Sequence, residues 1–259
     1  MNDLLDFLER VNAATSIEAV WQELLAATEP FGFDRLLYGY TRFKSGNSFG
    51  NIEDVLILTN HPPEYTDTYI GERLYTMAPM VRWASENVGA CSWNWMRRNA
   101  EKLSPSERMV AEFNLKMGVT AGWVVSFPSS SVRARGAIAL TARRGIDQDQ
   151  ADAIWEVHGR VLHQMATAAH MKFAALPFTS SARQLTDRQR EALEWVGDGK
   201  TTQDIATIMG LTPATIEKHL RLAREALDVD TTAQAVLKAS FQNQIFVVQG
   251  DSAGTARGG

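Results

Sequence analysis

Aromatic side chains are concentrated in the middle of the 259-residue chain, and their chemistry suits the walls of a small-molecule pocket. They are Tyr65, Tyr69, Tyr75, Trp83, Trp93, Trp95 and Trp123. An elongated apolar ligand needs apolar walls and a few hydrogen-bond donors, and buried tryptophan and tyrosine supply both. Each residue alone could equally be core packing. Because they are so concentrated, we expect a ligand pocket.

A second group of residues, near the C-terminus, has the chemistry of a DNA-binding surface. Thr212 is a good N-cap and Pro213 suits the first position of a helix. The apolar residues that then recur at helical spacing are Ile216, Leu220, Ala223 and Leu227. Lys218 and Arg221 lie on the opposite face. The pattern therefore predicts a helix with an apolar back and a basic front.

The residues before this helix complete a helix-turn-helix. Ile205, Ala206 and Met209 form the apolar face of a short helix, and Gly210 allows a tight turn. This geometry presents the second helix to a DNA major groove, although small helix pairs also occur in proteins that do not bind DNA. The candidate DNA-contacting residues are Lys200, Thr201, Thr215, Lys218, His219, Arg221 and Arg224.

No pattern in the chain indicates catalysis. We find no nucleophile elbow, phosphate loop or pair of acids, so we expect no catalytic residue, no metal and no cofactor. His158, His163 and His170 fall on one predicted helix without further ligand partners, which favours a solvated or interface role. Cys91 is the single cysteine, which excludes an internal disulfide and a cysteine zinc site.

Composition constrains how the chain would bind DNA. The formal net charge is −4, so phosphate neutralisation should give each monomer modest affinity. Two recognition helices on two half-sites would compensate, which predicts a homodimer on a roughly palindromic operator. The last predicted helix carries a candidate pairing surface, which could equally pack within its own domain: Ala233, Val236, Leu237 and Ser240.

The chain is long enough for two globular domains. We expect a ligand-binding domain at residues 1–172, a linker at 173–184, a DNA-binding domain at 185–248 and a disordered tail at 249–259. No run of 18 apolar residues or signal-like N-terminus is present, which predicts a cytoplasmic protein without membrane contact.

Helix and strand signals alternate in the first domain. Helices are expected at residues 3–11, after a Thr15–Glu18 capping box, at 63–70, 79–87, 105–117 and 148–171. Strands are expected at residues 35–43, 54–58, 120–127 and 134–142. These signals predict an α/β/α sandwich with a mainly antiparallel sheet, followed by an all-α four-helix domain.

Residues 185–239 resemble the DNA-binding domain of LuxR-type regulators. The resemblance is carried by Leu185-Thr186-Asp187-Arg188, Gly199-Lys200-Thr201, Ile205-Ala206 and Thr215-Ile216-Glu217-Lys218-His219-Leu220. Two positions depart from the family. Gln189 replaces a glutamate, which should weaken a structural hydrogen bond, and residues 230–232 lack an arginine that contacts phosphate.

Residues 61–122 resemble the autoinducer-binding domain of the same regulators. The matching residues are His61-Pro62, Tyr65, Tyr69, Ala78-Pro79, Trp93, Gly118 and Gly122. The resemblance implies a pocket for an N-acyl-homoserine lactone. Trp93 would donate to the lactone carbonyl, Tyr69 would lie beside the acyl carbonyl, Tyr65 would pack on the lactone ring, and Thr141 would bond the amide or acyl carbonyl.

Ala78 departs from this pattern. The family has an aspartate there, which accepts the ligand's amide N–H, and His61 stands where many members have a tyrosine. An unsatisfied buried donor costs roughly 1–3 kcal/mol. Ala78 therefore favours either a compensating acceptor, such as Thr141 or a water, or a ligand that lacks the N–H.

Three hypotheses follow. The first is a LuxR-type regulator controlled by an acyl-homoserine lactone or a similar apolar acyl signal. The second is a DNA-binding regulator of the same fold that senses another ligand or acts without one. The third, an enzyme acting on a lactone or acyl group, has no catalytic pattern to support it. A response regulator is disfavoured because the first half lacks a receiver's acidic cluster.

Overall fold

The computed structural model describes residues 2–44, 49–129, 131–178 and 184–246. It divides the chain into two compact units, Met1–Ala174 and Ala175–Gly259. The tail expected at residues 249–259 lies outside the described residues, as does the middle of the expected linker, residues 179–183. Within the described ranges, no helix is both long and apolar enough to cross a membrane.

A five-stranded sheet forms the middle layer of the first unit, in the order β2-β1-β5-β4-β3. The strands are β1 (Phe33–Thr41), β2 (Val55–Thr59), β3 (Gly89–Ser92), β4 (Gly122–Ser126) and β5 (Arg135–Ala142). Every neighbouring pair is antiparallel. Strand β5 is central, with β1 on one side and β4 on the other.

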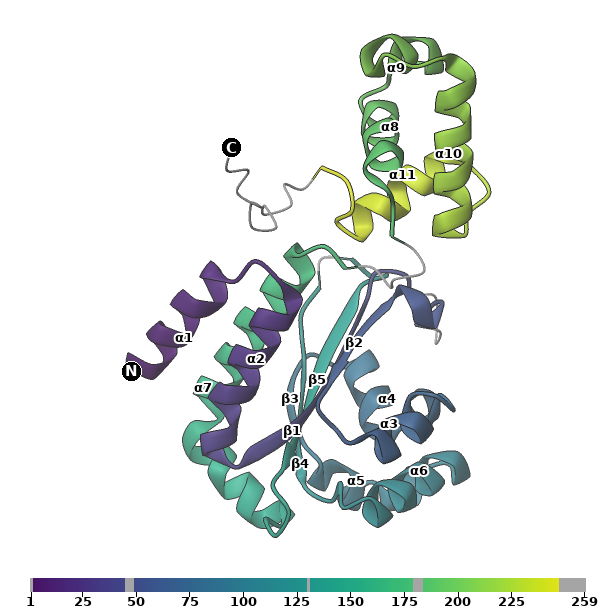
Figure 1. Cartoon of the computed structure of the whole chain (residues 1–259). Helices are drawn as coiled ribbons and strands as arrows, with labels where there is room; N and C mark the ends of the chain where they lie inside the picture. Colours follow the sequence, from purple (N-terminus) through teal and green to yellow (C-terminus); the bar gives the residue numbers. More distant parts are fainter. Residues whose placement is uncertain (1, 45–48, 130, 179–183, 247–259) are drawn as a thin grey trace. The chain divides into compact units, whose positions relative to one another are not determined.

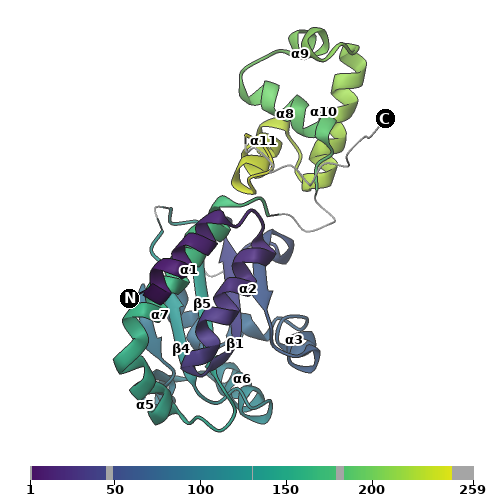
Figure 2. The ribbon, with the colours of Figure 1, turned by 60° about the vertical axis from the view of Figure 1, so that its left-hand side comes forward.

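Helices cover both faces of this sheet (Figures 1 and 2). One face carries α1 (Asn2–Ala13), α2 (Ile17–Thr28) and α7 (Gln148–Ala175). The other carries α3 (Pro63–Tyr69), α4 (Pro79–Glu86), α5 (Asn94–Arg98) and α6 (Pro105–Lys116). Short 3-10 helices lie between them: η1 (Glu29–Phe31), η2 (Ile52–Asp54), η3 (Leu74–Met77) and η4 (Ala100–Lys102). This arrangement confirms the predicted α/β/α sandwich.

The two faces of the sheet differ in what they pack against. Successive strand residues point to opposite faces. Tyr38 of β1 is fully buried against α7, where its ring centroid lies 4.8 Å from that of Phe173. The alternate residue Gly39 and its pairing partner Ala137 of β5 face the other way, toward α3–α6. That second face is less tightly filled, and the candidate site lies there.

Local capping signals set the helix boundaries, with one shift from prediction. In the capping box of α6, Ser104 Oγ accepts from the Glu107 N–H at 3.1 Å, and Glu107 Oε2 accepts from the Ser104 N–H at 2.8 Å. The Thr15–Glu18 box is wrong by one residue. Ser16 caps α2, because its extended backbone lets its Oγ accept from the Ala19 N–H at 3.1 Å.

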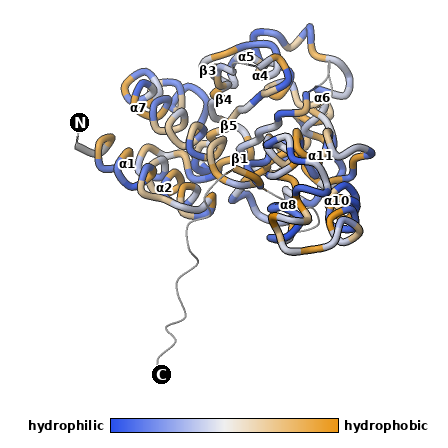
Figure 3. The backbone as a smooth tube through the Cα atoms, turned by 90° about the horizontal axis from the view of Figure 1, so that it is seen from above, coloured by the Kyte–Doolittle hydropathy of each residue, from blue (hydrophilic) through white to orange (hydrophobic). Residues whose placement is uncertain are grey.

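The second unit is all-α, as predicted. It contains α8 (Asp187–Gly197), α9 (Thr202–Met209), α10 (Pro213–Leu227) and α11 (Thr232–Phe241). A threonine caps each helix: Thr186, Thr201, Thr212 and Thr231. Hydrophilic and hydrophobic residues alternate along α8, α10 and α11 (Figure 3). All four helices contribute buried apolar residues to one core, such as Leu193, Ile205, Ile216 and Ala235.

The turn of the helix-turn-helix depends on Gly210. Its backbone is left-handed, with φ +65°, which a residue without a Cβ adopts at little cost. The apolar stripe predicted for α10 is buried, and Ile216 and Leu227 are fully so. Gln189 does not lose the hydrogen bond expected of a glutamate, since its Oε1 accepts from the Thr186 N–H at 2.9 Å.

Candidate functional site

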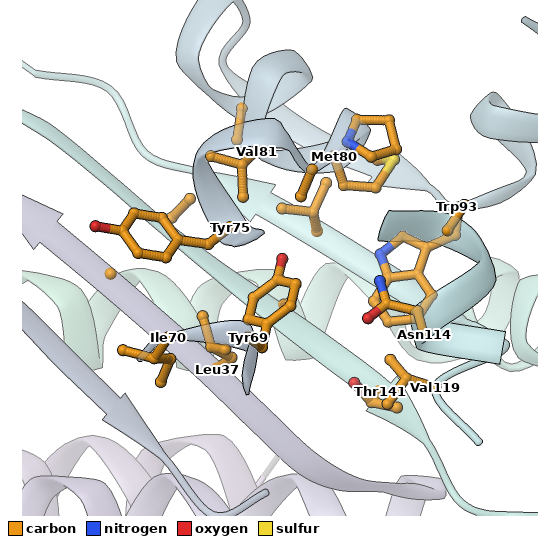
Figure 4. A pocket seen from close by; sticks show the side chains of 18 of the residues that line it. Leu37, Tyr69, Ile70, Tyr75, Met80, Val81, Trp93, Asn114, Val119 and Thr141 are labelled. Carbon is orange, nitrogen blue, oxygen red and sulfur yellow. The ribbon is translucent and has the colours of Figure 1, made fainter. Parts of the chain in front are cut away.

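A cavity of about 460 Å³ lies between the sheet and helices α3, α4 and α6. Strands β1 and β5 form its floor, and Figure 4 shows side chains from both layers converging on it. The lining is mainly apolar, with a small number of polar groups. This size and composition are typical of pockets for small organic ligands.

Trp93 provides an unused hydrogen-bond donor in the cavity wall. The side chain is buried, and its indole Nε1 has no hydrogen-bond partner in the described structure. A buried donor without a partner costs free energy, so a bound ligand with an acceptor would be favoured there. The Trp93 backbone N–H donates to the Gly122 carbonyl at 3.1 Å, which fixes the residue at the start of α5.

Tyr65 and Tyr69 stack on one wall of the cavity, with ring centroids 4.9 Å apart. The Tyr65 hydroxyl donates to Asn114 Oδ1 at 3.0 Å. The Tyr69 hydroxyl points into the cavity (Figure 4). Burial raises the pKa of both phenols well above their ordinary value. Both therefore stay protonated, and Tyr69 offers a donor to a ligand.

His61 and Thr141 form a polar pair in the cavity wall. His61 Nε2 and Thr141 Oγ1 are 3.3 Å apart, and the His61 ring stacks on Tyr65 at 4.6 Å. Burial lowers the pKa of His61 to about 4, so the imidazole is neutral. A neutral imidazole has one donor and one acceptor nitrogen, and its Nδ1 has no partner in the described structure. The pair can thus turn either a donor or an acceptor toward a ligand.

Ala78 contributes only a methyl group to this wall. It is 3% exposed and stands at the N-terminus of α4, where its carbonyl accepts from the Arg82 N–H at 3.0 Å. Its own N–H donates to the Tyr75 carbonyl at 3.2 Å. The position therefore has no side-chain acceptor, and its backbone groups are already paired.

The structure brings all the predicted ligand residues to this one cavity: His61, Tyr65, Tyr69, Ala78, Trp93 and Thr141. Tyr75 joins them, but Trp83, Trp95 and Trp123 do not line it. Trp123 instead stacks on Trp155 of α7, with centroids 4.4 Å apart. The core-packing alternative is thus correct for that residue.

Sequence reasoning missed several polar residues of the lining, among them Asn114, Arg135 and Arg97 of α5. Arg135 lies on the same face of β5 as Thr141, at a spacing of six residues. Its strand alternation was the available signal, but a charged residue at a strand end is usually solvated. Asn114 lies on α6 one helical turn after Ala111, which also lines the cavity.

In the second unit, α10 presents the predicted basic front. Lys218 and Arg221 are exposed, while Thr215 and His219 are half-buried. Arg221 pairs with Glu225 one turn later, and this neutralises part of the basic charge. The exposed face therefore offers Lys218, which has no ion-pair partner among the described residues, and Arg221, whose exposed ion pair is weak enough to exchange for a phosphate.

The other predicted DNA-contacting residues do not all lie free. Lys200 is exposed just before α9, and Thr201 is engaged as the N-cap of that helix, with its N–H donating to Asp204 Oδ2 at 3.0 Å. Arg224 donates to Thr232 Oγ1 at 2.9 Å and so connects α10 to α11. This bond gives Arg224 a role within the unit.

The histidines of α7 form no metal site. Among the described residues, no group of three or more histidine, cysteine, aspartate or glutamate side chains could hold an ion. Of the expected solvated or interface roles, a solvated one does not describe His170, which is half-buried between α7 and the sheet. Its Nδ1 lies 2.8 Å from the Tyr38 hydroxyl, and its ring stacks on Phe127 at 4.2 Å. Burial lowers the pKa of His170 to about 4.

An α/β/α unit with an apolar cavity, joined in one chain to a helix-turn-helix unit, defines a ligand-responsive class of DNA-binding regulators. The model of the autoinducer binding domain matches residues 16–173, and the model of sigma-70 region 4 matches residues 178–227. The chain belongs to the autoinducer-binding, LuxR-type transcriptional regulators. This is a family of regulators, not of enzymes.

Individual relatives agree with this assignment. The transcriptional activator AnoR of Acinetobacter nosocomialis is 24% identical over 238 residues, which are 90% of this chain and 95% of AnoR. The activator LuxR of Aliivibrio fischeri is 24% identical over 196 residues, which are 74% of this chain and 76% of LuxR. A structure of SdiA with octanoyl-rac-glycerol has a TM-score of 0.54 at 16% identity and covers 92% of this chain and 93% of SdiA. Another structure, of Escherichia coli SdiA, has a TM-score of 0.53 at 17% identity and covers 93% of this chain and 97% of SdiA. These structures show a shared fold.

Proposed function

We propose that this protein is a quorum-sensing regulator whose first unit binds an N-acyl-homoserine lactone or a similar apolar acyl signal, and which binds DNA as a homodimer. The observation that carries the proposal is the buried Trp93 Nε1, which lies in the wall of an apolar cavity and has no hydrogen-bond partner among the described residues. The ligand-binding role falls to residues 1–172 and the DNA-binding role to residues 185–248. The proposed linker, 173–184, begins within the last turn of α7, where Phe173 is still buried.

The cavity chemistry supports a specific pose for the ligand head. Trp93 donates to the lactone carbonyl and Tyr69 to the acyl carbonyl, while Tyr65 packs on the ring. Thr141 supplies either a donor or an acceptor, depending on the His61 tautomer. The acyl chain then runs along the floor of small and apolar residues on β1 and β5: Leu37, Gly39, Ala137 and Ala139.

A second candidate is a signal without an amide N–H, and Ala78 favours it. The position that would accept the amide proton carries a methyl group. The donors Trp93 and Tyr69 suit a head group made of acceptors, such as an ester or a lactone. SdiA, which shares the fold, was solved with octanoyl-rac-glycerol, an ester. Both candidate signals use the same cavity. They differ only in whether the ligand has an amide N–H that needs an acceptor from the protein.

Ligand binding is expected to stabilise the first unit by mass action. The coupling to DNA then follows from the homodimer, which holds two α10 helices at the spacing of two half-sites on a roughly palindromic operator. Modest basic charge on each α10 makes the second half-site necessary. Leu237 of α11 is 52% exposed and is available for pairing between subunits, whereas Val236 packs into its own core.

Thermal unfolding of the purified protein with matched ligands tests the proposal. We would compare acyl-homoserine lactones of increasing chain length with the corresponding acyl esters of the lactone alcohol, which lack the amide N–H. A rise in Tm that depends on chain length supports the acyl pocket. A larger rise with the esters favours the second candidate, and no rise with either series from folded protein contradicts both.

A further inference from the structure

We propose that the end of the cavity farthest from Trp93 is an anion-binding subsite in which Arg135 holds a carboxylate at the terminus of the ligand's chain. This inference rests on the proposed function, since it concerns the tail of the ligand whose head contacts Trp93. It narrows the signal to an amphiphile that is polar at both ends.

Strand register places Arg135 in the cavity floor. On β5, Arg135 and Thr141 are six residues apart on the same face, with Ala137 and Ala139 between them. A strand rises about 3.3 Å per residue, so the two side chains begin about 20 Å apart along the floor. Thr141 belongs to the head end of the cavity, and Arg135 therefore marks the opposite end.

The described residues beside Arg135 in the cavity lining carry no negative charge. Its pairing partner on β1 is Thr41, whose hydroxyl already donates to the Phe49 carbonyl at 3.0 Å and accepts from the Phe43 N–H at 3.1 Å. The adjacent residues Phe49 and Val55 add apolar surface to the lining. Among the described residues that line the cavity, none is an aspartate or a glutamate.

Arg135 is half-buried, and one nitrogen of its guanidinium is left without a hydrogen-bond acceptor among the described residues. Its Nε is buried and has no hydrogen-bond partner in the part of the chain that the structure describes. Leaving a buried donor without an acceptor costs free energy. A carboxylate is the acceptor that its planar fork matches best, and the hydrogen bonds would be charge-assisted.

Matched pairs of probes, one pair at each chain length, test the subsite on the full-length protein. Each pair has an acyl-homoserine lactone that ends in a methyl group and an analogue of equal length that ends in a carboxylate. Binding is measured by calorimetry over a series of chain lengths. At the length that reaches Arg135, we expect the carboxylate to bind about ten- to one-hundredfold more tightly than the methyl compound.

Variants locate the effect. Arg135→Met keeps an unbranched stem but removes the charge, so it should abolish the preference or reverse it. Arg135→Lys, which retains the charge, should retain a reduced preference. Arg133→Met is the matched control, because Arg133 is exposed and does not line the cavity, and it should bind both probes as the wild type does.

The possible outcomes distinguish a failure of the proposed anion-binding subsite from a failure of the proposed acyl pocket. Equal or tighter binding of the methyl compound at every length overturns the subsite but leaves the acyl pocket intact. Loss of the preference in Arg97→Met instead of Arg135→Met assigns the carboxylate to the other arginine of the lining and also overturns it. Binding of neither probe by folded protein overturns the proposed function, and the subsite with it.

Discussion

Trp93 and Gly122 are joined by a backbone hydrogen bond of 3.1 Å, and the indole ring lies against the space where Gly122 lacks a side chain. A Cβ built at Gly122 would come 2.3 Å from the Leu140 carbonyl oxygen and 3.1 Å from Trp93 Cζ2. The Gln148 amide brackets the same glycine, accepting from its N–H at 3.0 Å and donating to its carbonyl at 3.1 Å. The position of the indole donor thus depends on a glycine in the neighbouring strand.

Gly122→Ala should therefore destabilise the first unit and disturb the ligand site together. The clash with backbone cannot be relieved by a side-chain rotation, and overpacking of this kind costs about 1–3 kcal/mol. Denaturant unfolding of the full-length variant measures the loss. Gly39→Ala is the control for stability, since a Cβ there would meet no atom within 4 Å. Equal stability of the two variants would contradict the packing argument.

Trp93→Phe should weaken the response to the ligand without unfolding the protein. Phenylalanine keeps an aromatic wall but removes the indole N–H, whose hydrogen bond to a ligand carbonyl contributes about 0.5–1.5 kcal/mol, up to roughly tenfold in affinity. A ligand dose response of a reporter gene, with calorimetry, measures the change.

Trp123→Phe is the matched control for this variant. Trp123 Nε1 is also buried and unpaired among the described residues, but the side chain stacks on Trp155 and does not line the cavity. Its loss should leave ligand affinity unchanged. If both variants kept the wild-type dose response, the assigned pose of the ligand head would be wrong.

Periodicity and capping explain why most of the architecture could be predicted. Helix α10 has a cap, a first-turn proline and an unbroken apolar stripe, so its limits follow from local rules. Strand β3 has only four residues, and α5 has five, which is too short for either period to appear. Strand β3 forms because it pairs with β4, and α5 begins directly after Trp93, whose backbone N–H donates to the Gly122 carbonyl. Such tertiary contacts are not visible in a local sequence pattern.

The candidate site was also predictable in part: residues within the family motifs could be predicted, whereas contacts that depend on the packing of distant elements could not. The residues around Trp93 follow from the family resemblance, and all of them line the cavity. Alternation along β5 places Arg135 on the face of Thr141, but an arginine at a strand end is ordinarily solvent-exposed, and the sequence does not show that helices cover this face. Likewise, the bond from Arg224 to Thr232 depends on how α11 packs on α10.

Stability should fall when the pH is lowered from about 6.5 to 5, because the buried His61 and the half-buried His170 resist protonation. The pKa of His61 and that of His170 are both lowered by burial from 6.5 to about 4. In this window the unfolded chain binds a proton at each histidine while the folded chain does not. Their contribution is complete above pH 6.5 and is lost as the pH falls toward 4, at up to about 1.4 kcal/mol per pH unit for each.

Urea unfolding of the full-length protein at a series of pH values, monitored by tryptophan fluorescence, checks this slope. His61→Asn and His170→Asn should each reduce the slope by one proton, and the double variant should be nearly flat between pH 6.5 and 5. An undiminished slope in the double variant would show that other groups titrate in this window.

Lys218→Ala combined with Arg221→Ala should abolish operator binding while ligand binding and dimerisation persist. Both side chains lie exposed on the front of α10, remote from its buried stripe, so the fold of the second unit should survive. Each lost phosphate contact also lowers the dependence of log affinity on log salt by about one. Electrophoretic mobility shift at several salt concentrations measures both effects.

The control for this pair must remove charge from the same unit without touching α10. Arg188→Ala does so, since Arg188 is exposed on α8 and pairs with Glu191 at 2.8 Å. Loss of an exposed ion pair of this kind costs at most about 1 kcal/mol of stability, so the unit should stay folded. Operator affinity should then change little, because the predicted DNA-contacting face of α10 is intact. If the control lost operator binding while the Lys218 and Arg221 double variant kept it, the DNA-contacting surface would lie on α8, and α10 would have only a structural role.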